Sequence, residues 1–312
     1  MNAFKKLGFF SAFIIPILVI VGYKMGGGWN YLTVGFTFVI MPILDYLVGK
    51  DPSNPDESQI PKLLEERYYR FITFVWVYVQ VGMVIWGAYA FATAHFGFWI
   101  AFGFVMSMSQ VTGGIGITVA HELGHQKTKI EQIYSQILLM TVCYTHFFIE
   151  HNKGHHVWVA TPKDPASSRK GENFYSFWLR TVVGSFKSAW RIEADSLSRK
   201  GINVWSWHNT MLWYITLPIV FCALLTAGWS LYVGQILWLI PVFFVWQSFH
   251  AFSLLEVINY IEHYGITRQE VAPNRYERVN PIHSWNANQL VTNFFLFQLQ
   301  RHSAVSDLTT FR

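Results

Sequence analysis

Two long stretches of this chain carry no charged side chain. Residues Phe71–Ala120 and Ile202–Leu255 contain no Asp, Glu, Lys or Arg. A helix needs about 20 apolar residues to cross a bilayer, so each stretch has room for a hairpin of two transmembrane helices. Leu7–Tyr23 and Trp29–Val48 predict a third hairpin, with Asp45 near its end. Only 13% of the residues are charged, about half of the ~25% usual in soluble domains, which favours a membrane protein.

We therefore expect an all-α integral membrane protein, with one domain over residues 1–312, six transmembrane helices and a cytoplasmic helical cap. The apolar run Ile133–Ile149 is interpreted as a buried or half-immersed helix, because polar residues interrupt it. Glu172–Lys200 has the amphipathic spacing of a helix at the membrane surface. Asp51–Glu66 is expected to be a linker, and Pro273–Asn286 a loop. The six spans are expected at about residues 7–23, 29–48, 71–93, 97–119, 211–228 and 231–257.

The distribution of basic residues predicts the orientation. The loops near Gly26, Ala94 and Ala227 hold one of the 23 Lys and Arg residues, Lys24, and the opposite side holds the other 22. By the positive-inside rule, both termini are expected in the cytoplasm. The first apolar run follows two lysines but has no small-residue cleavage site, so we interpret it as a retained anchor and not a cleaved signal peptide.

Histidines gather near the ends of the apolar stretches. His121 and His125 are four residues apart, as are His151 and His155, so each pair is expected on one face of a helix, with His156 about 100° round. Imidazole is the commonest protein ligand for metals. The two motifs hold more imidazoles than one catalytic zinc uses, and all-histidine ligation suits iron better than calcium or magnesium. The pattern predicts a metalloenzyme.

Other interpretations stay open on these residues alone. His-Glu-x-x-His is also the motif of zinc metalloproteases, with Glu122 as the general base, so a membrane zinc metalloprotease is an alternative. The run Gly113-Gly114-Ile115-Gly116 is expected to permit close helix packing. The isolated histidines are expected to be packed or interfacial, with the one in a loop somewhat more open to metal binding: His95, His146, His208, His250 and, in the loop, His283.

Four segments, in order along the chain, resemble those of the bacterial alkane 1-monooxygenases (alkane ω-hydroxylases). The second is the most specific, because the tail Ala-Thr-Pro-Lys-Asp-Pro-Ala-Ser-Ser follows it at residues 160–168. Fatty acid desaturases share only the looser histidine spacing. The segments are HELGH at 121–125, EHNKGHH at 150–156, NYIEHYG at 259–265 and LQRHS at 299–303.

The resemblance implies terminal hydroxylation of medium- or long-chain n-alkanes to 1-alkanols with O2. It implies two non-haem iron ions, a multi-pass location in the bacterial inner membrane, and electrons from reduced rubredoxin fed by an NADH-dependent rubredoxin reductase. Carried over position by position, the iron ligands are His121, His125, His151, His155, His156, His263 and His302. The candidates for orienting them through the second ring nitrogen are Glu122, Glu150, Asp164 and Glu262.

The last histidine motif departs from the family. The family continues His-Ser-Asp-His-His, whereas this chain reads Ser303-Ala304-Val305-Ser306 after His302. Neither Val nor Ser replaces an imidazole, so two ligands are absent. A frameshift, a truncated gene or a sequencing error would each produce this divergence. We therefore expect a weakened second iron site, and a catalytically inactive remnant is a further alternative.

A substrate dissolved in lipid is expected to reach the metal through an apolar channel between the spans. The net charge of +5 and the basic cap could dock an acidic electron carrier or hold anionic membrane lipid, and nothing indicates nucleic-acid binding. The expected wall residues of the channel are Phe36, Phe38, Trp76, Ile85, Phe104 and Leu255.

Overall fold

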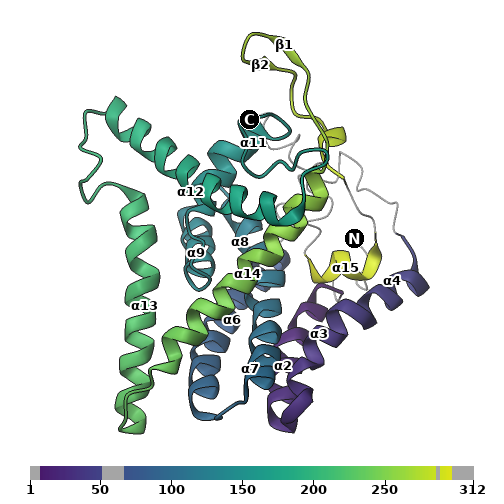
Figure 1. Cartoon of the computed structure of the whole chain (residues 1–312), viewed down its shortest axis with the longest axis vertical. Coiled ribbons are helices and arrows are strands. Elements are labelled where there is room, and N and C mark those ends of the chain that lie inside the picture. The colour runs from purple at the N-terminus through teal and green to yellow at the C-terminus, as the bar shows by residue number, and fades with distance from the viewer. Residues whose placement is uncertain (1–7, 51–66, 286–288, 297–312) are drawn as a thin grey trace.

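The computed structural model describes residues 8–50, 67–285 and 289–296, and it is largely helical (Figure 1). The linker expected at 51–66 lies outside these residues. In the part of the chain that is described, five helices are long and apolar enough to cross a membrane, at Gly27–Val48, Arg70–Thr93, Phe98–Gly124, Thr210–Val233 and Leu239–His263. The first expected span is a shorter apolar helix, Phe10–Met25, so the count of six is not confirmed.

The N-terminal hairpin is built from short helical pieces, whereas the later spans are longer, with a π-helical turn in the one at Phe98–Gly124. The helical elements in chain order are η1 (Phe9–Phe13), α2 (Ile14–Met25), η2 (Gly27–Tyr31), α3 (Leu32–Gly35), η3 (Phe36–Ile40), α4 (Met41–Val48), α6 (Arg67–Thr93), α7 (Phe98–Ser109), η4 (Gln110–Ile115), α8 (Gly116–Gly124), α9 (Lys129–Met140), α10 (Phe147–Glu150), η5 (His151–His155), α11 (His156–Trp158), α12 (Phe174–Arg199), α13 (Thr210–Val233), α14 (Leu239–His263), η6 (Pro281–His283) and α15 (Leu290–Phe295).

Three spans end later than the hydropathy pattern predicts. The helix expected at 97–119 continues through α8 to Gly124, and the last one continues to His263. Two of the predicted ligands, His121 and His263, therefore lie on the spans themselves. The turn expected near Ala227 is wrong, because α13 continues to Val233. It ends at Gly234, whose φ of 77° is a left-handed conformation that glycine adopts without a Cβ clash.

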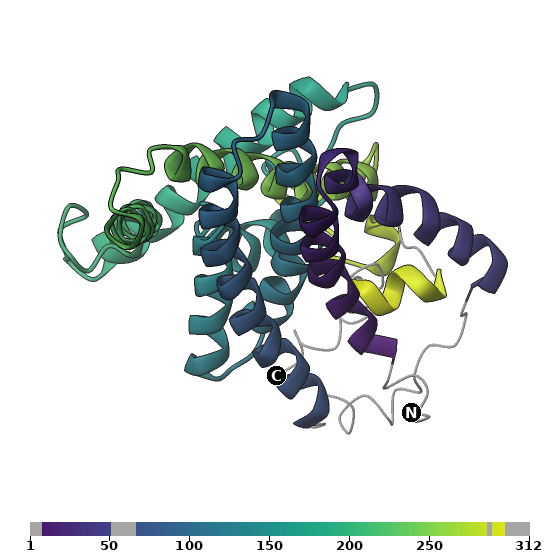
Figure 2. The ribbon, with the colours of Figure 1, turned by 90° about the horizontal axis from the view of Figure 1, so that it is seen from below.

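The helices α6, α7 and α14 form the centre of the bundle, and Figure 2 shows α13 end-on at its outer side. Trp76, Phe104 and Phe243 are fully buried between them. The glycine run has the packing role that was expected: a Cβ on Gly113 would lie 2.5 Å from the backbone of Ala251 on α14. Small residues of this kind let transmembrane backbones approach closely.

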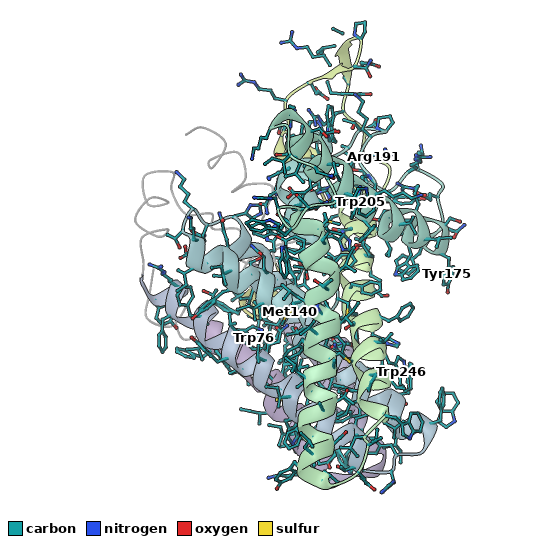
Figure 3. The ribbon with its side chains drawn as sticks, turned by 90° about the vertical axis from the view of Figure 1, so that its left-hand side faces the viewer. Trp76, Met140, Tyr175, Arg191, Trp205 and Trp246 are labelled. Carbon is teal, nitrogen blue, oxygen red and sulfur yellow. The ribbon has the colours of Figure 1, made fainter. Side chains whose placement is uncertain are left out.

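The cap covers the end of the bundle that carries the histidine motifs (Figure 1). The helix α9 stops at Met140, and α10 begins only at Phe147, so the apolar run Ile133–Ile149 is not one continuous helix. The amphipathic prediction for α12 is confirmed: Phe177 and Thr181 are buried, whereas Tyr175 is 83% exposed and projects away from the body in Figure 3. Apolar side chains on that outer face are suited to lipid contact.

Two small features lie beside the cap. Where a loop was expected, the strands β1 (Glu270–Ala272) and β2 (Arg275–Tyr276) form a short antiparallel hairpin. The helix α15 packs on α4, and the backbone N–H groups of Val291 and Thr292 donate to the Asp45 carboxylate. The charge near the end of the second expected span is thereby hydrogen-bonded.

Candidate metal centre

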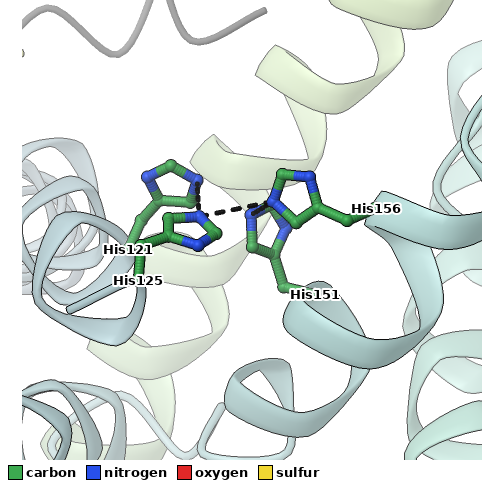
Figure 4. Close-up of side chains that lie close together, drawn as sticks. All are labelled: His121, His125, His151 and His156. Atoms are coloured by element: carbon green, nitrogen blue, oxygen red, sulfur yellow. Dashed lines mark hydrogen bonds between the residues drawn. The ribbon is translucent and has the colours of Figure 1, made fainter. Parts of the chain in front are cut away.

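Four histidine side chains converge at the end of the bundle (Figure 4). His121 and His125 come from the end of α8, and His151 and His156 come from η5 and α11. One ring nitrogen of each lies within 4.8 Å of those of the other three. The Nε2 atoms of His121 and His125 are 3.1 Å apart. The Nε2 atom of His156 lies 2.9 Å from that of His151 and 3.3 Å from that of His125.

These separations fit ligation of one shared metal ion. A metal with imidazole nitrogens at about 2.0–2.1 Å holds neighbouring donor atoms roughly 2.8–3.4 Å apart in octahedral or tetrahedral geometry. The three measured nitrogen pairs span 2.9–3.3 Å. Ring nitrogens suit a transition metal, whereas calcium and magnesium prefer oxygen. The donor set therefore fits the metal class that the sequence predicts.

The backbone of the second motif decides which histidines meet. Its turn η5 is π-helical, and the His156 N–H donates to the His151 carbonyl five residues earlier. Residues five apart therefore point to the same side, which brings His151 and His156 together. The expected grouping of His151 with His155 on one face is also found, because their rings stack with centroids 5.3 Å apart, and His155 contacts a second set of partners as well.

His155 and His263 form this second set, with ring centroids 4.9 Å apart. Nδ1 of His155 is 2.9 Å from Oδ2 of Asp164. This carboxylate also accepts from the Ser167 hydroxyl at 2.6 Å. Nδ1 of His263 faces the His283 carbonyl at 3.4 Å. In both histidines Nδ1 is engaged, so Nε2 is left to bind a metal.

The pKa values of the cap histidines follow from burial and neighbouring charge. Burial, together with nearby imidazoles, lowers the pKa of His125 to about 3 and that of His156 to about 2. Burial likewise lowers the pKa of His151 well below its ordinary value. In His155 burial also lowers the pKa, but the Asp164 carboxylate outweighs it and raises the pKa to about 9. Three of the four are thus neutral at pH 7, the form that binds metals.

A cavity opens beside the histidines, and apolar side chains line part of it: Ile117, Phe147, Leu255 and Ile258. Of the six expected channel residues, Leu255 is in this wall. Trp76 and Phe104 are instead fully buried in the helix core, and Phe38 is 54% exposed on the outside. Phe36 packs on Phe295. The sequence could not separate these roles, because core, lipid-facing and channel positions are all apolar.

The four candidate orienting carboxylates differ in their surroundings. Asp164 bonds His155 directly, and Glu262 lines the cavity. Glu122 lies 3.7 Å from Nδ1 of His121. Glu150 is buried, and its Oε1 has no hydrogen-bond partner among the described residues. Burial, followed by the charge of Asp164, raises the pKa of Glu150 to about 8.

The remaining histidines take structural positions. His283 is buried, but its ring accepts from the Asn280 N–H and lies 3.3 Å from Glu277. His146 is buried against Tyr144 and Phe186. His208 stacks on Trp207, His250 faces the Trp246 carbonyl, and His95 lies in the turn after α6. His302, Val305 and Ser306 lie outside the described residues.

Sequence reasoning did not single out Glu256, a buried carboxylate on α14 seven residues before His263. The one feature of the sequence that could have identified Glu256 is its position directly after the second uncharged stretch.

Comparison with known proteins gives a consistent set of relatives. The fatty acid desaturase family matches residues 96–304, which include all seven predicted ligands. Alkane 1-monooxygenase 2 of Pseudomonas aeruginosa is 41% identical over 307 residues, 96% of this chain and 80% of that protein. Alkane 1-monooxygenase 2 of Alcanivorax borkumensis is 40% identical over 96% of this chain and 78% of its own length. The hydroxylase component of the xylene/toluene monooxygenase of Pseudomonas putida is 27% identical over 88% of this chain and 70% of its own.

Proposed function

Because this chain belongs to the alkane 1-monooxygenases of the fatty acid desaturase family, which are oxidoreductases, we propose that it hydroxylates the terminal carbon of medium- or long-chain n-alkanes. The observation that carries the proposal is the convergence of four histidines at metal-ligand separations beside an apolar-walled cavity. Curated relatives at about 41% identity over most of the chain are named for this reaction.

The proposed reaction inserts one atom of O2 into a terminal C–H bond and releases the other as water, which consumes two electrons and two protons. Bound iron supplies redox chemistry that side-chain acid–base groups cannot perform on an unactivated C–H bond. We propose His121, His125, His151 and His156 as ligands of one iron, and His155 and His263 as ligands of the other.

The chain's own residues bind and orient the substrate. The walls at Ile117, Phe147 and Leu255 exclude water and hold an alkyl chain with its methyl end toward the histidines. Asp164 holds His155 with Nδ1 engaged. We assign the same orienting role to Glu122, Glu150 and Glu262, because each lies next to a ligand histidine in the chain.

We propose that the second iron site is the weaker one. Its described ligands are two histidines, and the residues that would complete it in the family follow His302, where Val305 and Ser306 stand. The four-histidine group needs none of those positions. This chain is therefore expected to retain one iron tightly and a second iron poorly.

The electron donor we propose is reduced rubredoxin, fed by its NADH-dependent reductase. The positive-inside distribution supports a location in the bacterial inner membrane with the histidine motifs on the cytoplasmic face, where such a carrier is available.

A reconstitution experiment tests the proposal. The full chain, purified in detergent, is assayed for iron content and, with rubredoxin, its reductase, NADH and O2, for 1-octanol from octane. We expect bound iron and the 1-alcohol, and a variant with histidine at 305 and 306 should gain iron and turnover. If both the unaltered chain and the variant with the two added histidines bind iron but form no alcohol, the proposed hydroxylase activity is contradicted. An inactive remnant is then favoured.

The zinc metalloprotease alternative is disfavoured by the same geometry. A catalytic zinc keeps an open position beside three protein ligands, whereas four histidines converge here. Oxygen-independent proteolysis that is lost in Glu122→Gln would restore that alternative.

A further inference from the structure

Glu256 is a carboxylate placed where charges are rare. It lies within the transmembrane helix α14, is 1% exposed and belongs to none of the histidine motifs. An ionisable side chain inside a membrane span is costly to bury, and such residues usually serve a site. Its neighbours Leu255 and Asn259 line the cavity beside the histidines.

Three donors from different parts of the chain bond this carboxylate. The Tyr144 hydroxyl donates to Oε1 at 2.7 Å, from the turn between α9 and α10. The Thr181 hydroxyl, on α12, donates to Oε2 at 3.0 Å. The Asn259 amide, one turn further along α14, donates to Oε2 at 3.1 Å. The carboxylate therefore joins the cap to the span that ends in His263.

A continuous stack of rings leads from Tyr144 to the histidine group. Tyr144 stacks on Phe147, with ring centroids 6.2 Å apart, and Phe147 stacks on His151 at 4.6 Å. A change in the position of Tyr144 is thus transmitted to a ligand imidazole through close-packed rings. Glu256 acts on both histidine groups, on His151 through this stack and on His263 through α14.

The negative charge of the Glu256 carboxylate gives a second reason for its position near the histidines. The six described histidines supply no negative charge to a bound metal ion, and a buried centre gains from counter-charge in its low-dielectric surroundings. Glu256 is buried on the same helix as His263, and its neighbours Leu255 and Asn259 line the cavity beside the histidines.

We propose that Glu256 is a positioning residue of the metal centre, whose carboxylate holds Tyr144, α12 and α14 together and supplies counter-charge to the metal. This inference rests on the proposed function only in assuming that the histidines bind a transition metal.

Binding of Co²⁺ to the full chain in detergent tests the inference without turnover. Co²⁺ reports its ligand geometry through its visible absorption. We expect Glu256→Gln to weaken Co²⁺ binding by about tenfold or more and to change the spectrum, as losses of outer-shell partners do. Glu256→Asp, which keeps the charge, should recover part of the affinity, and Tyr144→Phe should change the spectrum in the same direction to a smaller extent.

Glu193→Gln is the matched control, because that carboxylate is also buried and accepts from the Thr210 N–H but lies at the α12–α13 junction.

Glu256→Gln with the wild-type affinity and spectrum, even at lower thermal stability, would overturn the inference and leave a purely structural role. Should Glu256→Gln not fold, the pair Tyr144→Phe with Thr181→Val removes two of the three donors, and wild-type Co²⁺ binding by that variant overturns the inference equally. Failure of the unaltered chain to bind Co²⁺ would instead reject the proposed metal centre.

Discussion

The contacts of single side chains explain why particular residue types occur around the histidines. Asp164 accepts from His155, from the Ser167 hydroxyl and, through Oδ1, from the Ala166 N–H at 3.0 Å. The Ala160 N–H in turn donates to Ser167. The tail after the second motif is thus a loop that folds around one carboxylate and points it at one imidazole.

Asp164→Asn should weaken metal binding or activity by about 10- to 100-fold, the usual effect of losing an outer-shell carboxylate. The amide keeps the size of the side chain but removes the charge that favours Nδ1–H on His155. Metal per chain and alcohol formation measure the effect, with the exposed Asp195→Asn on α12 as the control. Equal metal content and turnover in the two variants would show that His155 needs no carboxylate.

At the scale of elements, irregular helical turns set the histidine positions. The π-helical turn η4 lies within the third described span and directly precedes α8, the helix that carries His121, and η5 contains most of the second motif. Such turns are frequently found at functional sites, because they add a residue and rotate the following side chains. Glycines allow η4 to pack directly on α14.

Gly113→Ala should lower the free energy of unfolding by about 1–3 kcal/mol, the usual cost of overpacking. The added Cβ would lie 2.5 Å from the Ala251 backbone, which cannot move as a side chain would. Gly114→Ala is the control, since its Cβ would approach no closer than 3.5 Å to Gln110. Thermal unfolding in detergent measures both variants, and equal stability would mean that α14 does not pack this closely.

The loop before α12 depends on one guanidinium. Arg180 donates to both carboxylate oxygens of Glu172 at 2.8 and 2.7 Å and to the carbonyls of Pro165 and Ser167. Arg180→Lys cannot reproduce this fork and should lower the free energy of unfolding by roughly 1.5–3 kcal/mol at neutral pH.

This loss should depend on pH. Hydrogen bonding from Arg180 holds the pKa of Glu172 below its ordinary value of 4.5. The ion pair therefore stabilises the fold above about pH 4.5 and is lost as the pH falls through the folded-state pKa. The difference in Tm between Arg180→Lys and the unaltered chain should shrink in acid. A difference that stayed constant down to pH 3 would assign the loss to the carbonyl contacts instead.

Over the whole molecule, the spans bring an apolar wall against a polar metal centre at one end of the bundle. Leu255 on α14 contributes to that wall and is 8% exposed, whereas Val257, two residues later, is 38% exposed. One helix thus supplies cavity lining, a buried carboxylate and a histidine within its last nine residues.

Leu255→Phe should reduce 1-octanol formation by about tenfold or more with unchanged iron content, because the larger ring displaces the methyl group that must approach the metal. Val257→Phe makes the same exchange on the outer face and should leave turnover near that of the unaltered chain. Product analysis and iron assays distinguish the two. Similar turnover in both variants would place the substrate elsewhere.

The sequence alone was sufficient for the class of fold and for most of the candidate site. Hydropathy over about 20 residues and i, i+4 spacing are local properties, so the membrane helices and the histidine motifs could be recognised without knowledge of packing. Six of the seven predicted ligands lie together, and His302 is outside the described residues. Helix ends were less predictable. The charged residues Glu122 and Glu262 end the apolar pattern, but the helices α8 and α14 continue past them.

Only the tertiary structure decided how the histidines divide into groups and what supports them. The π-helical turn η5 adds His156 to the partners of His151, because its backbone hydrogen bonds depend on how the motif packs against α12. The three donors of Glu256 are up to 112 residues away in the chain, so no local pattern records that they meet. The composition of a helix determines whether it is more stable in lipid or in water. Contacts between distant segments determine which side chains share a site.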